Sequence, residues 1–290
     1  MSFISIIIPT FNSEGTIQRL LEAFQNDSVQ SDYEILVIDG CSKDRTVEIC
    51  KQYKVKVFYN PKIHAAAARN IGIEHAKGEI CAFIDSDCVP CKGWVDVINR
   101  LFAEDKNIIA VGGNMMPYPP KNRIEEFAGD VFINKLVCFS DNRLESFSNQ
   151  VKHSFVTANC AYRTDILREL GGFNDFFSNN GEDLDLFWRA INSKKGRLIY
   201  EPRLVVQHSF PDTNKKLFLK YRQYGLAIAK LASRYSSIRF QVDWRFHFRF
   251  LGVLLTWLFR PRWNSFSVVY MSGFMWGKLI GSFKYHVICL

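Results

Sequence analysis

The sequence predicts an α/β fold built on a mostly parallel β-sheet. Short apolar runs rich in Ile and Val alternate with amphipathic segments through the first hundred residues. Polar side chains stand directly after each apolar run, where the strands of such a sheet present their ligand-binding ends. The chain has 290 residues, of which 48% are apolar, so it is long enough to bury a large core.

Strand and helix are expected to alternate four times from the N-terminus. Continuous apolar runs predict buried parallel strands, beginning with Phe3–Pro9. Asn12 or Ser13 is expected to cap the first helix, because these side chains accept hydrogen bonds from helical N–H groups. The expected strands are residues 3–9, 33–38, 55–59 and 80–84, and the expected helices are about 13–24, 44–53 and 65–77. This alternation predicts a doubly wound sheet with right-handed crossovers.

The following segment is less regular. A helix is expected at about 94–103 and a strand at 108–113, whereas Pro117, Pro119 and Pro120 mark residues 114–150 as irregular. Further along, the sequence predicts a strand at 155–162, a short helix at 165–170 closed by Gly171-Gly172, a helix at 182–193, and strands at 197–200 and 205–208.

The C-terminal part differs in charge. Residues 203–290 contain 14 Lys and Arg against two acids, a net charge of +12, whereas residues 1–202 carry 23 bases and 27 acids, a net charge of −4. We therefore expect a catalytic domain at 1–210 and a basic, aromatic, helical region at 211–290. Nucleic acid and anionic membrane are the usual partners of such a region, and its apolar runs favour the membrane over nucleic acid.

Two apolar stretches could contact that membrane. Residues 246–259 are interrupted by His247 and Arg249, and residues 266–283 are interrupted only by Lys278 and reach the lower length limit for a membrane span. We expect peripheral or monotopic attachment to the cytoplasmic membrane face, with one C-terminal span as the alternative. Gly residues at 273, 277 and 281 permit close helix packing in either case.

The cytoplasmic expectation comes from the cysteines and the N-terminus. The eight cysteines show no regular framework of the kind that disulfide-stapled domains have. The sequence MSFISIIIPTF lacks the basic and long apolar regions of a secretory signal. Reduced thiols in the cytoplasm are the simplest interpretation.

The stretch CAFIDSDCVPC at residues 81–91 combines two candidate motifs. Asp85 and Asp87 are two residues apart, so at the end of a strand they point the same way and favour a Mn²⁺ or Mg²⁺ ion bridging to a diphosphate. The alternative is a solvated loop with two acids. Cys88 and Cys91 form a C-x-x-C pair, but a structural zinc site needs a second pair, which the sequence lacks. We expect both thiols to pack beneath the loop.

Other polar residues are expected on the same rim. They follow the first three strands and are Thr10, Asn12, Asp39, His64 and Arg69. Their convergence on one edge with the two aspartates favours a functional site over a solvated loop.

Two further segments offer catalytic or ligating groups. Glu182 and Asp183 begin an expected helix, where acids either complement the helix dipole or supply a general base. The dipole is expected to lower the pKa of the base and keep it ionised. His208 ends an expected strand, and its imidazole is either structural or a further ligand for a cation held by Asp87.

Six ordered stretches resemble the family 2 inverting, nucleotide-sugar-dependent glycosyltransferases, which have the Rossmann-like GT-A fold. These are SIIIPTFN, EILVIDGCSKDRT, AAAARNIGI, AFIDSDCVP, TANCAYRTDILRELGGFND and GEDLDLFWR, between residues 4 and about 208. The resemblance implies that the nucleotide is contacted by Pro9, Thr10, Asn12, Asp39, Arg69 and Asp85. It also implies that Asp87 and His208 hold or adjoin Mn²⁺ or Mg²⁺ on the diphosphate. It further implies that Asp183 is the catalytic base and that Asn159 and Glu182 lie near the acceptor.

The sequence departs from the family pattern at two places. Ile38 stands where many members carry the first acid of Asp-Asp-Gly-Ser, so Asp39 is assigned the remaining role. Processive members carry Q-x-x-R-W, whereas residues 241–245 read QVDWR, with the last two residues reversed. We therefore expect single transfers.

The resemblance implies an enzyme that moves a sugar from a nucleotide-diphosphate donor, with UDP favoured, to a hydroxyl of a lipid-linked or cell-envelope glycan. The alternatives are a polyprenyl-phosphate sugar synthase of the same family, a nucleotidyltransferase, and a non-catalytic membrane-associated binding protein. A nucleotidyltransferase would need a Gly-rich basic loop after the first strand, whereas PTFNSEGT has one Gly and no base.

Overall fold

The computed structural model describes residues 2–135, 155–178, 180–235, 244–259 and 261–287. Its contacts divide the chain into two compact units. The first comprises Met1–Tyr118, Ile133–Ser178 and Glu182–Ser209, and the second comprises Pro119–Phe132, Asn179–Gly181 and Phe210–Leu290.

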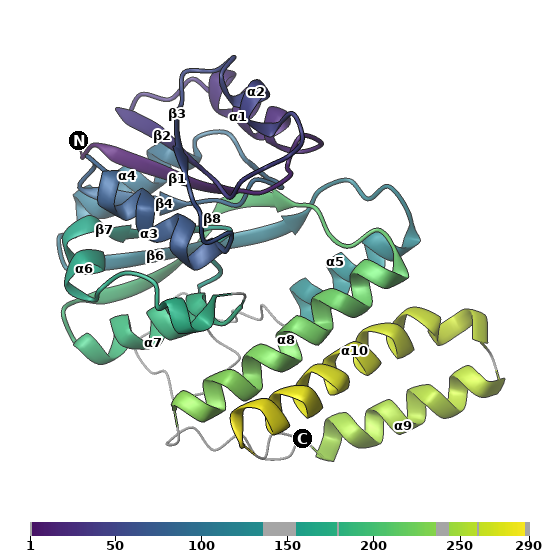
Figure 1. Cartoon of the computed structure of the whole chain (residues 1–290). Helices are drawn as coiled ribbons and strands as arrows, with labels where there is room; N and C mark the ends of the chain where they lie inside the picture. Colours follow the sequence, from purple (N-terminus) through teal and green to yellow (C-terminus); the bar gives the residue numbers. More distant parts are fainter. Residues whose placement is uncertain (1, 136–154, 179, 236–243, 260, 288–290) are drawn as a thin grey trace. The chain divides into compact units, whose positions relative to one another are not determined.

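The first unit is built on an eight-stranded sheet in the order β3-β2-β1-β4-β7-β6-β8-β5 (Figure 1). The strands are β1 (Ile4–Thr10), β2 (Tyr33–Asp39), β3 (Lys56–Tyr59), β4 (Ile80–Phe83), β5 (Cys88–Pro90), β6 (Ile108–Pro117), β7 (Cys160–Arg163) and β8 (Arg197–His208). The first four strands are mutually parallel, as predicted. Strand β7 runs antiparallel to both β4 and β6, and β5 runs antiparallel to β8.

Helices cover both faces of this sheet. They are α1 (Ile17–Gln25), α2 (Thr46–Cys50), α3 (Ala65–His75), α4 (Trp94–Glu104), α6 (Thr164–Glu169) and α7 (Glu182–Ser193), with a short 3₁₀ turn, η2, at Asp175–Phe177. Helix α3 packs on β1 and β2 and contacts α6. Phe24 of α1 meets Trp94 of α4 edge to face. Because both faces are covered, most residues of the central strands are apolar, and Ile38 is fully buried.

Several expected boundaries were wrong. Helix α1 begins at Ile17 instead of residue 13, because Asn12 has a left-handed φ of 48° and the Ser13 carbonyl accepts from Thr16 and Ile17 in a turn. Strand β7 begins at Cys160 rather than 155. The two strands expected at 197–200 and 205–208 are one strand, β8, whose pairing with β6 shifts register at Gly113/Asn114.

The prediction that residues 114–150 are irregular was also wrong for the first half of that segment. Strand β6 continues to Pro117, and helix α5 (Arg123–Lys135) follows. The Asn122 side chain accepts from the N–H groups of Ile124 and Glu125, so it caps this helix. The prolines masked that capping signal. Residues 136–150 lie outside the described residues.

The second unit contains α5 up to Phe132 together with α8 (Asn214–Arg234), α9 (Trp244–Phe259) and α10 (Pro261–Tyr285). Helices α8 and α10 are in close contact because glycines remove side chains at their interface. A Cβ on Gly277 would meet the Arg222 carbonyl, and one on Gly273 would meet the Phe218 carbonyl. The close packing predicted from the glycine spacing is confirmed. None of the helices in the described ranges has the length and apolarity needed to cross a bilayer.

We predict that Gly277→Ala destabilises the second unit, because the added methyl group must push the α8 backbone away, at a cost of about 1–3 kcal/mol. The matched control is Gly252→Ala in α9, where nothing lies within 4 Å of an added Cβ. That change should raise stability by up to about 1 kcal/mol, through helix propensity alone. Thermal denaturation followed by circular dichroism measures both. Equal behaviour of the two variants would contradict the packing argument.

Candidate functional site

A cleft of about 260 Å³ opens at the carboxyl ends of the parallel strands in the first unit. Its lining residues are Pro9, Thr10, Phe11, Ser13, Gly40, Asn60, Ile63, His64, Ala65, Ala68, Arg69, Asp85, Ser86 and Asp87. Of the expected residues, Pro9, Thr10, His64, Arg69, Asp85 and Asp87 are therefore brought together. Asn60 and Ser86 were not predicted, although Asn60 follows an expected strand and Ser86 follows Asp85.

Arg69 is the central charge of this site. It lies on α3, is buried, and forms two ion pairs, with Asp85 at 2.8 Å and with Glu182 at 2.9 Å. Burial alone would lower the pKa of Arg69, but the charges of Asp85 and Glu182 outweigh it and raise that pKa. The guanidinium also lies 5.5 Å from the Phe173 ring. Arg69, expected to reach the nucleotide, thus joins the end of β4 to the start of α7.

Asp183 follows Glu182 at the start of α7. Loss of hydration raises its pKa to about 7, and the neighbouring Glu182 charge adds to this rise. The Leu184 N–H and the charge of Arg69 oppose it more weakly. The expectation that the helix dipole would lower this pKa was wrong, because desolvation and a like charge outweigh the helix terminus. A carboxylate with this pKa is a stronger base than an exposed one.

Asp39 ends β2 and is buried. One carboxylate oxygen accepts from the Ser42 N–H at 3.0 Å. The other, Oδ1, is buried and has no hydrogen-bond partner among the described residues. A buried acceptor of this kind is costly unless a ligand completes it. Asp39 does not itself line the cleft, but its neighbour Gly40 does.

Asn12 does not line the cleft. Its side chain is exposed and accepts from the Lys43 N–H at 2.9 Å, while its own N–H donates to Ser42. These bonds fasten the loop after β1 to the loop after β2. The structure therefore gives Asn12 a part in loop geometry, and its contact with a nucleotide stays a prediction.

Asn159 was expected near the acceptor, and that role stays a prediction. Asn159 is buried, and both of its amide hydrogens are donated to backbone carbonyls, of Asn114 at 2.6 Å and Leu204 at 2.8 Å. Its amide oxygen accepts from the Trp94 indole at 2.8 Å. With these bonds made, Asn159 fastens the interior of the unit. Glu182, the other residue expected near the acceptor, is paired with Arg69.

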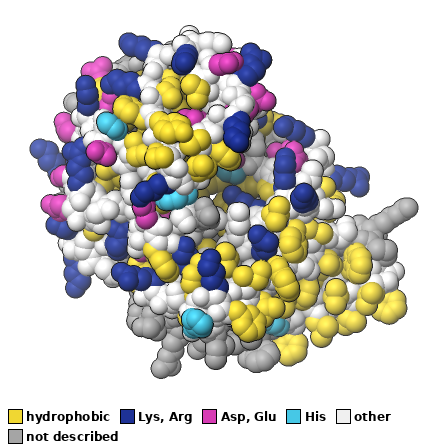
Figure 2. All heavy atoms as spheres, in the orientation of Figure 1, with side chains coloured by type: hydrophobic (Ala, Val, Ile, Leu, Met, Phe, Trp, Pro, Cys, Tyr) yellow, Lys and Arg dark blue, Asp and Glu magenta, His cyan; other side chains and the backbone are white. Residues whose placement is uncertain are grey.

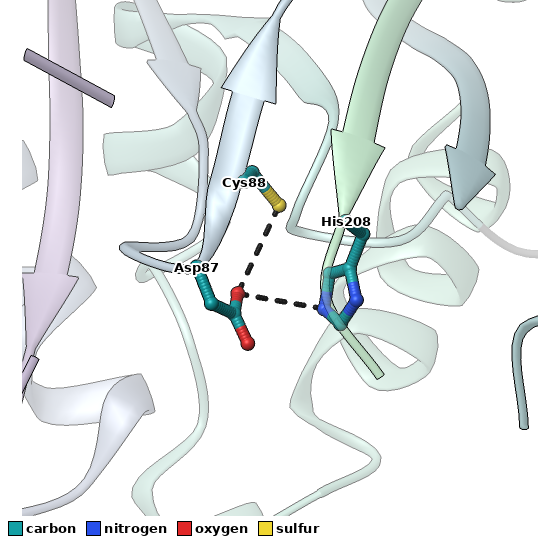
Figure 3. A group of neighbouring side chains, drawn as sticks. All are labelled: Asp87, Cys88 and His208. Atoms are coloured by element: carbon teal, nitrogen blue, oxygen red, sulfur yellow. Dashed lines mark hydrogen bonds and ion pairs between the residues drawn. The ribbon is translucent and has the colours of Figure 1, made fainter. Parts of the chain in front are cut away.

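Asp87, Cys88 and His208 form a cluster whose ligand atoms lie within 4.8 Å of one another (Figure 3). Asp87 Oδ1 is 3.5 Å from His208 Nε2 and 3.9 Å from Cys88 Sγ. The antiparallel ladder of β5 and β8 places Cys88 directly opposite His208 and so brings these distant positions together. Burial raises the pKa of the Cys88 thiol well above its usual value, so it stays protonated.

The oxygen and nitrogen donors of this cluster fit a divalent cation such as Mn²⁺ or Mg²⁺. The side chain of Asp87 is 42% exposed and lines the cleft, so a cation there could also contact a bound ligand. A protonated thiol is a weak ligand for such a hard ion, so Asp87 and His208 are the better candidates. Sequence analysis expected Cys88 to pack beside the loop, and it is indeed buried there.

Arg19 of α1 holds the backbone around this cluster. It donates to the Asp87 carbonyl at 3.1 Å and to the Ser209 hydroxyl, and its guanidinium lies 4.1 Å from the Tyr118 ring. The Ser209 N–H also donates to the Asp87 carbonyl, at 3.2 Å. Arg19 therefore fixes Asp87 relative to the residue after His208. No sequence motif marks Arg19, because its partners are distant along the chain.

Comparison with known proteins identifies the family. The model described as "Glycosyl transferase family 2" matches residues 5–171, more than half of the chain. The chain belongs to glycosyltransferase family 2. It is thus a glycosyltransferase with an α/β fold of the GT-A type, as the resemblance implied.

Relatives extend this comparison over most of the chain. A Methanococcus voltae dolichyl N-acetyl-alpha-D-glucosaminyl phosphate 3-beta-D-2,3-diacetamido-2,3-dideoxy-beta-D-glucuronosyltransferase is 28% identical over 88% of this chain and 81% of its own length. The Pyrobaculum calidifontis mannosyltransferase PcManGT, solved with GDP-Man and Mn²⁺, has 16% identity and a TM-score of 0.66 over 98% of this chain and 88% of its own. Staphylococcus aureus TarS 1–349 with UDP has 16% identity and a TM-score of 0.57 over 99% and 92%. The two solved structures support the fold alone.

We predict that Arg69→Met lowers stability by about 3–5 kcal/mol, because it leaves Glu182 and Asp85 without their buried cation. The matched control is Arg203→Met. Arg203 pairs with Glu201 at 2.8 Å, but its side chain is 66% exposed, so its loss should cost much less stability than the loss of Arg69. Urea denaturation of both variants measures the difference. Similar losses would show that the Arg69 pairs are not special.

Proposed function

We propose that this family 2 enzyme transfers a sugar from a nucleotide-diphosphate donor to a hydroxyl group of a lipid-linked or cell-envelope glycan, with inversion and one transfer at a time. The observation that carries this proposal is the double ion pair of Arg69. It fixes Asp85, two residues before the cation ligand Asp87, and Glu182, one residue before the base Asp183. One buried side chain thus fixes the segments that carry the two chemical groups an inverting transfer needs.

The donor would occupy the cleft at the strand ends. Pro9, Thr10 and Asp85 line it, and the unpartnered Asp39 oxygen beside it could accept an N–H from the nucleotide base. Asp87 and His208 would hold Mn²⁺ or Mg²⁺, which would neutralise the negative charge that develops on the leaving diphosphate. The Mn²⁺ and GDP-Man in the PcManGT structure are consistent with such a donor complex.

Asp183 would act as the general base. Inversion requires the acceptor hydroxyl to attack the anomeric carbon from the side opposite the diphosphate, and its proton must leave as the new bond forms. A carboxylate whose pKa is about 7 accepts that proton well and is still largely ionised above neutral pH. No covalent sugar–enzyme intermediate is needed.

The proposed donor nucleotide and acceptor are supported by the relatives of this chain. Relatives are solved with GDP-Man and with UDP, and UDP is the donor nucleotide favoured from the sequence. The Methanococcus relative is named for a dolichyl-linked glucosaminyl phosphate, which supports a lipid-linked acceptor. A polyprenyl-phosphate sugar synthase differs from this proposal only in the acceptor. The family match leaves no support for a nucleotidyltransferase.

We predict that Asp183→Asn lowers kcat by at least about a hundredfold while nucleotide binding persists, because the base is removed and the cleft is kept. Wild-type activity should fall as the pH drops below about 7, because Asp183 is then protonated.

The matched control is Asp165→Asn. Asp165 is also in the first turn of a helix and also accepts the next residue's N–H, but it is exposed. Near-normal transfer by Asp183→Asn would exclude it as the base.

Stability supplies a second readout for the same residue. The folded-state pKa of Asp183 lies above its unfolded value, so the wild type loses stability as the pH rises from about 4 to about 7. Asp183→Asn removes this loss. The variant should therefore melt higher than the wild type at pH 8, with a smaller difference at pH 5. No difference at either pH would show that Asp183 is not perturbed by burial.

We predict that Asp87→Ala abolishes the Mn²⁺-dependent part of donor binding and of transfer, whereas Cys88→Ser with Cys91→Ser does not. A thermal-shift panel of UDP-, GDP- and dTDP-sugars, each with and without Mn²⁺, measures this. The wild type should be stabilised by one nucleotide class, and more strongly with the ion. If Asp87→Ala kept the Mn²⁺ effect, the cation would have to bind at another site. If the double cysteine variant lost the Mn²⁺ effect, a cysteine sulfur would be a ligand.

A further inference from the structure

Helix α9 of the second unit is apolar on two faces. Phe246, Phe250, Val253, Leu254 and Trp257 are half-buried at helical spacing and form one face. Phe246 contacts Phe274 of α10, so this face packs against that helix. A helix that is apolar all round is normally buried on all sides. By this rule the opposite face of α9 would be covered as well.

That opposite face is exposed. Large apolar side chains recur along it at three- and four-residue intervals, with exposed fractions from 48% to 84%; these are Phe248, Leu251, Leu255, Leu258 and Phe259. Trp276, Leu279 and Phe283 are exposed on α10 with the same spacing. Figure 2 shows apolar side chains gathered over the part of the second unit formed by α9 and α10. Soluble surfaces seldom carry such a continuous apolar stripe without a partner.

The charge around this stripe identifies the partner's chemistry. Arg249 of α9 and Lys284 of α10 are exposed, whereas Lys278 is buried, and residues 244–285 contain no Asp or Glu. An apolar surface with exposed bases and no acid is complementary to anionic lipid headgroups over acyl chains. It is not complementary to a second copy of itself, because the two basic faces would repel one another.

The length of α9 decides how it would meet the lipid. Its 16 residues extend about 24 Å at 1.5 Å per residue, which is less than the bilayer core of about 30 Å. Exposed Arg249 lies within the helix. Both features suit a helix that lies along the surface of one leaflet and do not suit one that crosses the bilayer.

We propose that α9 lies in the interface of an anionic membrane, with Phe248, Leu251, Leu255 and Leu258 among the upper acyl chains. The packed face holds α9 on α10, and the second face supplies the membrane contact. This inference is independent of the sugar, the cation and the base proposed above. It concerns where the enzyme works and not what it transfers.

The test is flotation of the purified full chain with vesicles of phosphatidylcholine alone or mixed with phosphatidylglycerol. The wild type should float with the mixed vesicles and much less with phosphatidylcholine alone. Leu251→Gln with Leu255→Gln should lower the bound fraction at least about tenfold, because two inserted side chains are lost. Phe248→Gln with Leu258→Gln, on the same face, should do the same, and it serves as a second variant if the first melts early.

The matched control is Met116→Gln with Phe176→Gln, which replaces two exposed apolar side chains of the first unit, at 47% and 44% exposure. It should float like the wild type. Alkaline carbonate should release the bound wild type, since an interfacial helix does not span. The proposal is overturned if the wild type ignores both vesicles, if the α9 variants float unchanged, or if carbonate leaves the protein in the membrane. A wild-type dimer that the α9 variants convert to monomer, without vesicle binding, would assign the face to self-association instead.

Discussion

The candidate site depends on one buried cation. Arg69 lies on α3, and its two ion pairs reach the end of β4 through Asp85 and the start of α7 through Glu182. An arginine removed from water is stable because two carboxylates face it, and the buried carboxylate of Glu182 is stabilised in turn by the arginine. The planar guanidinium has two separate nitrogen edges for this, which a lysine lacks. Three segments distant in sequence are therefore fixed together by one side chain.

This arrangement also sets the electrostatics of the proposed base. Loss of hydration raises the pKa of Asp183 most, and the charge of Glu182 adds to the rise although Glu182 is paired with Arg69. The charge of Arg69 opposes the rise more weakly. If a positive charge fully offset the loss of hydration, Asp183 would be a weak base. If no positive charge lay nearby, Asp183 would stay protonated above neutral pH. The balance between desolvation and one shared cation places its pKa at about 7.

The elements that local residue patterns determine could be predicted from the sequence. The contacts between residues that meet only in the folded chain could not. The strands β1, β2 and β4 and the helix α7 were predicted closely, because continuous apolar runs and a first-turn acid cluster mark them directly. The polar residues after those strands were placed on one rim for the same reason. By contrast, Arg69 and Glu182 form an ion pair although they are 113 residues apart in the sequence. No periodic pattern of residues predicts such a pair. Asn159 sits in a motif of the family, yet its bonds to Trp94 and two carbonyls give it a structural task.

The charge of the cleft explains why a cation is expected there at all. Its charged lining residues, within the described chain, are Arg69, Asp85 and Asp87. The charge of Arg69 is already offset by Asp85 and Glu182, and Asp87 remains as a partly exposed carboxylate beside His208. A nucleotide diphosphate brings further negative charge into this setting and would be repelled by it. A divalent ion on Asp87 and His208 reverses the sign locally, so commitment of Arg69 to the scaffold makes the proposed donor dependent on a metal.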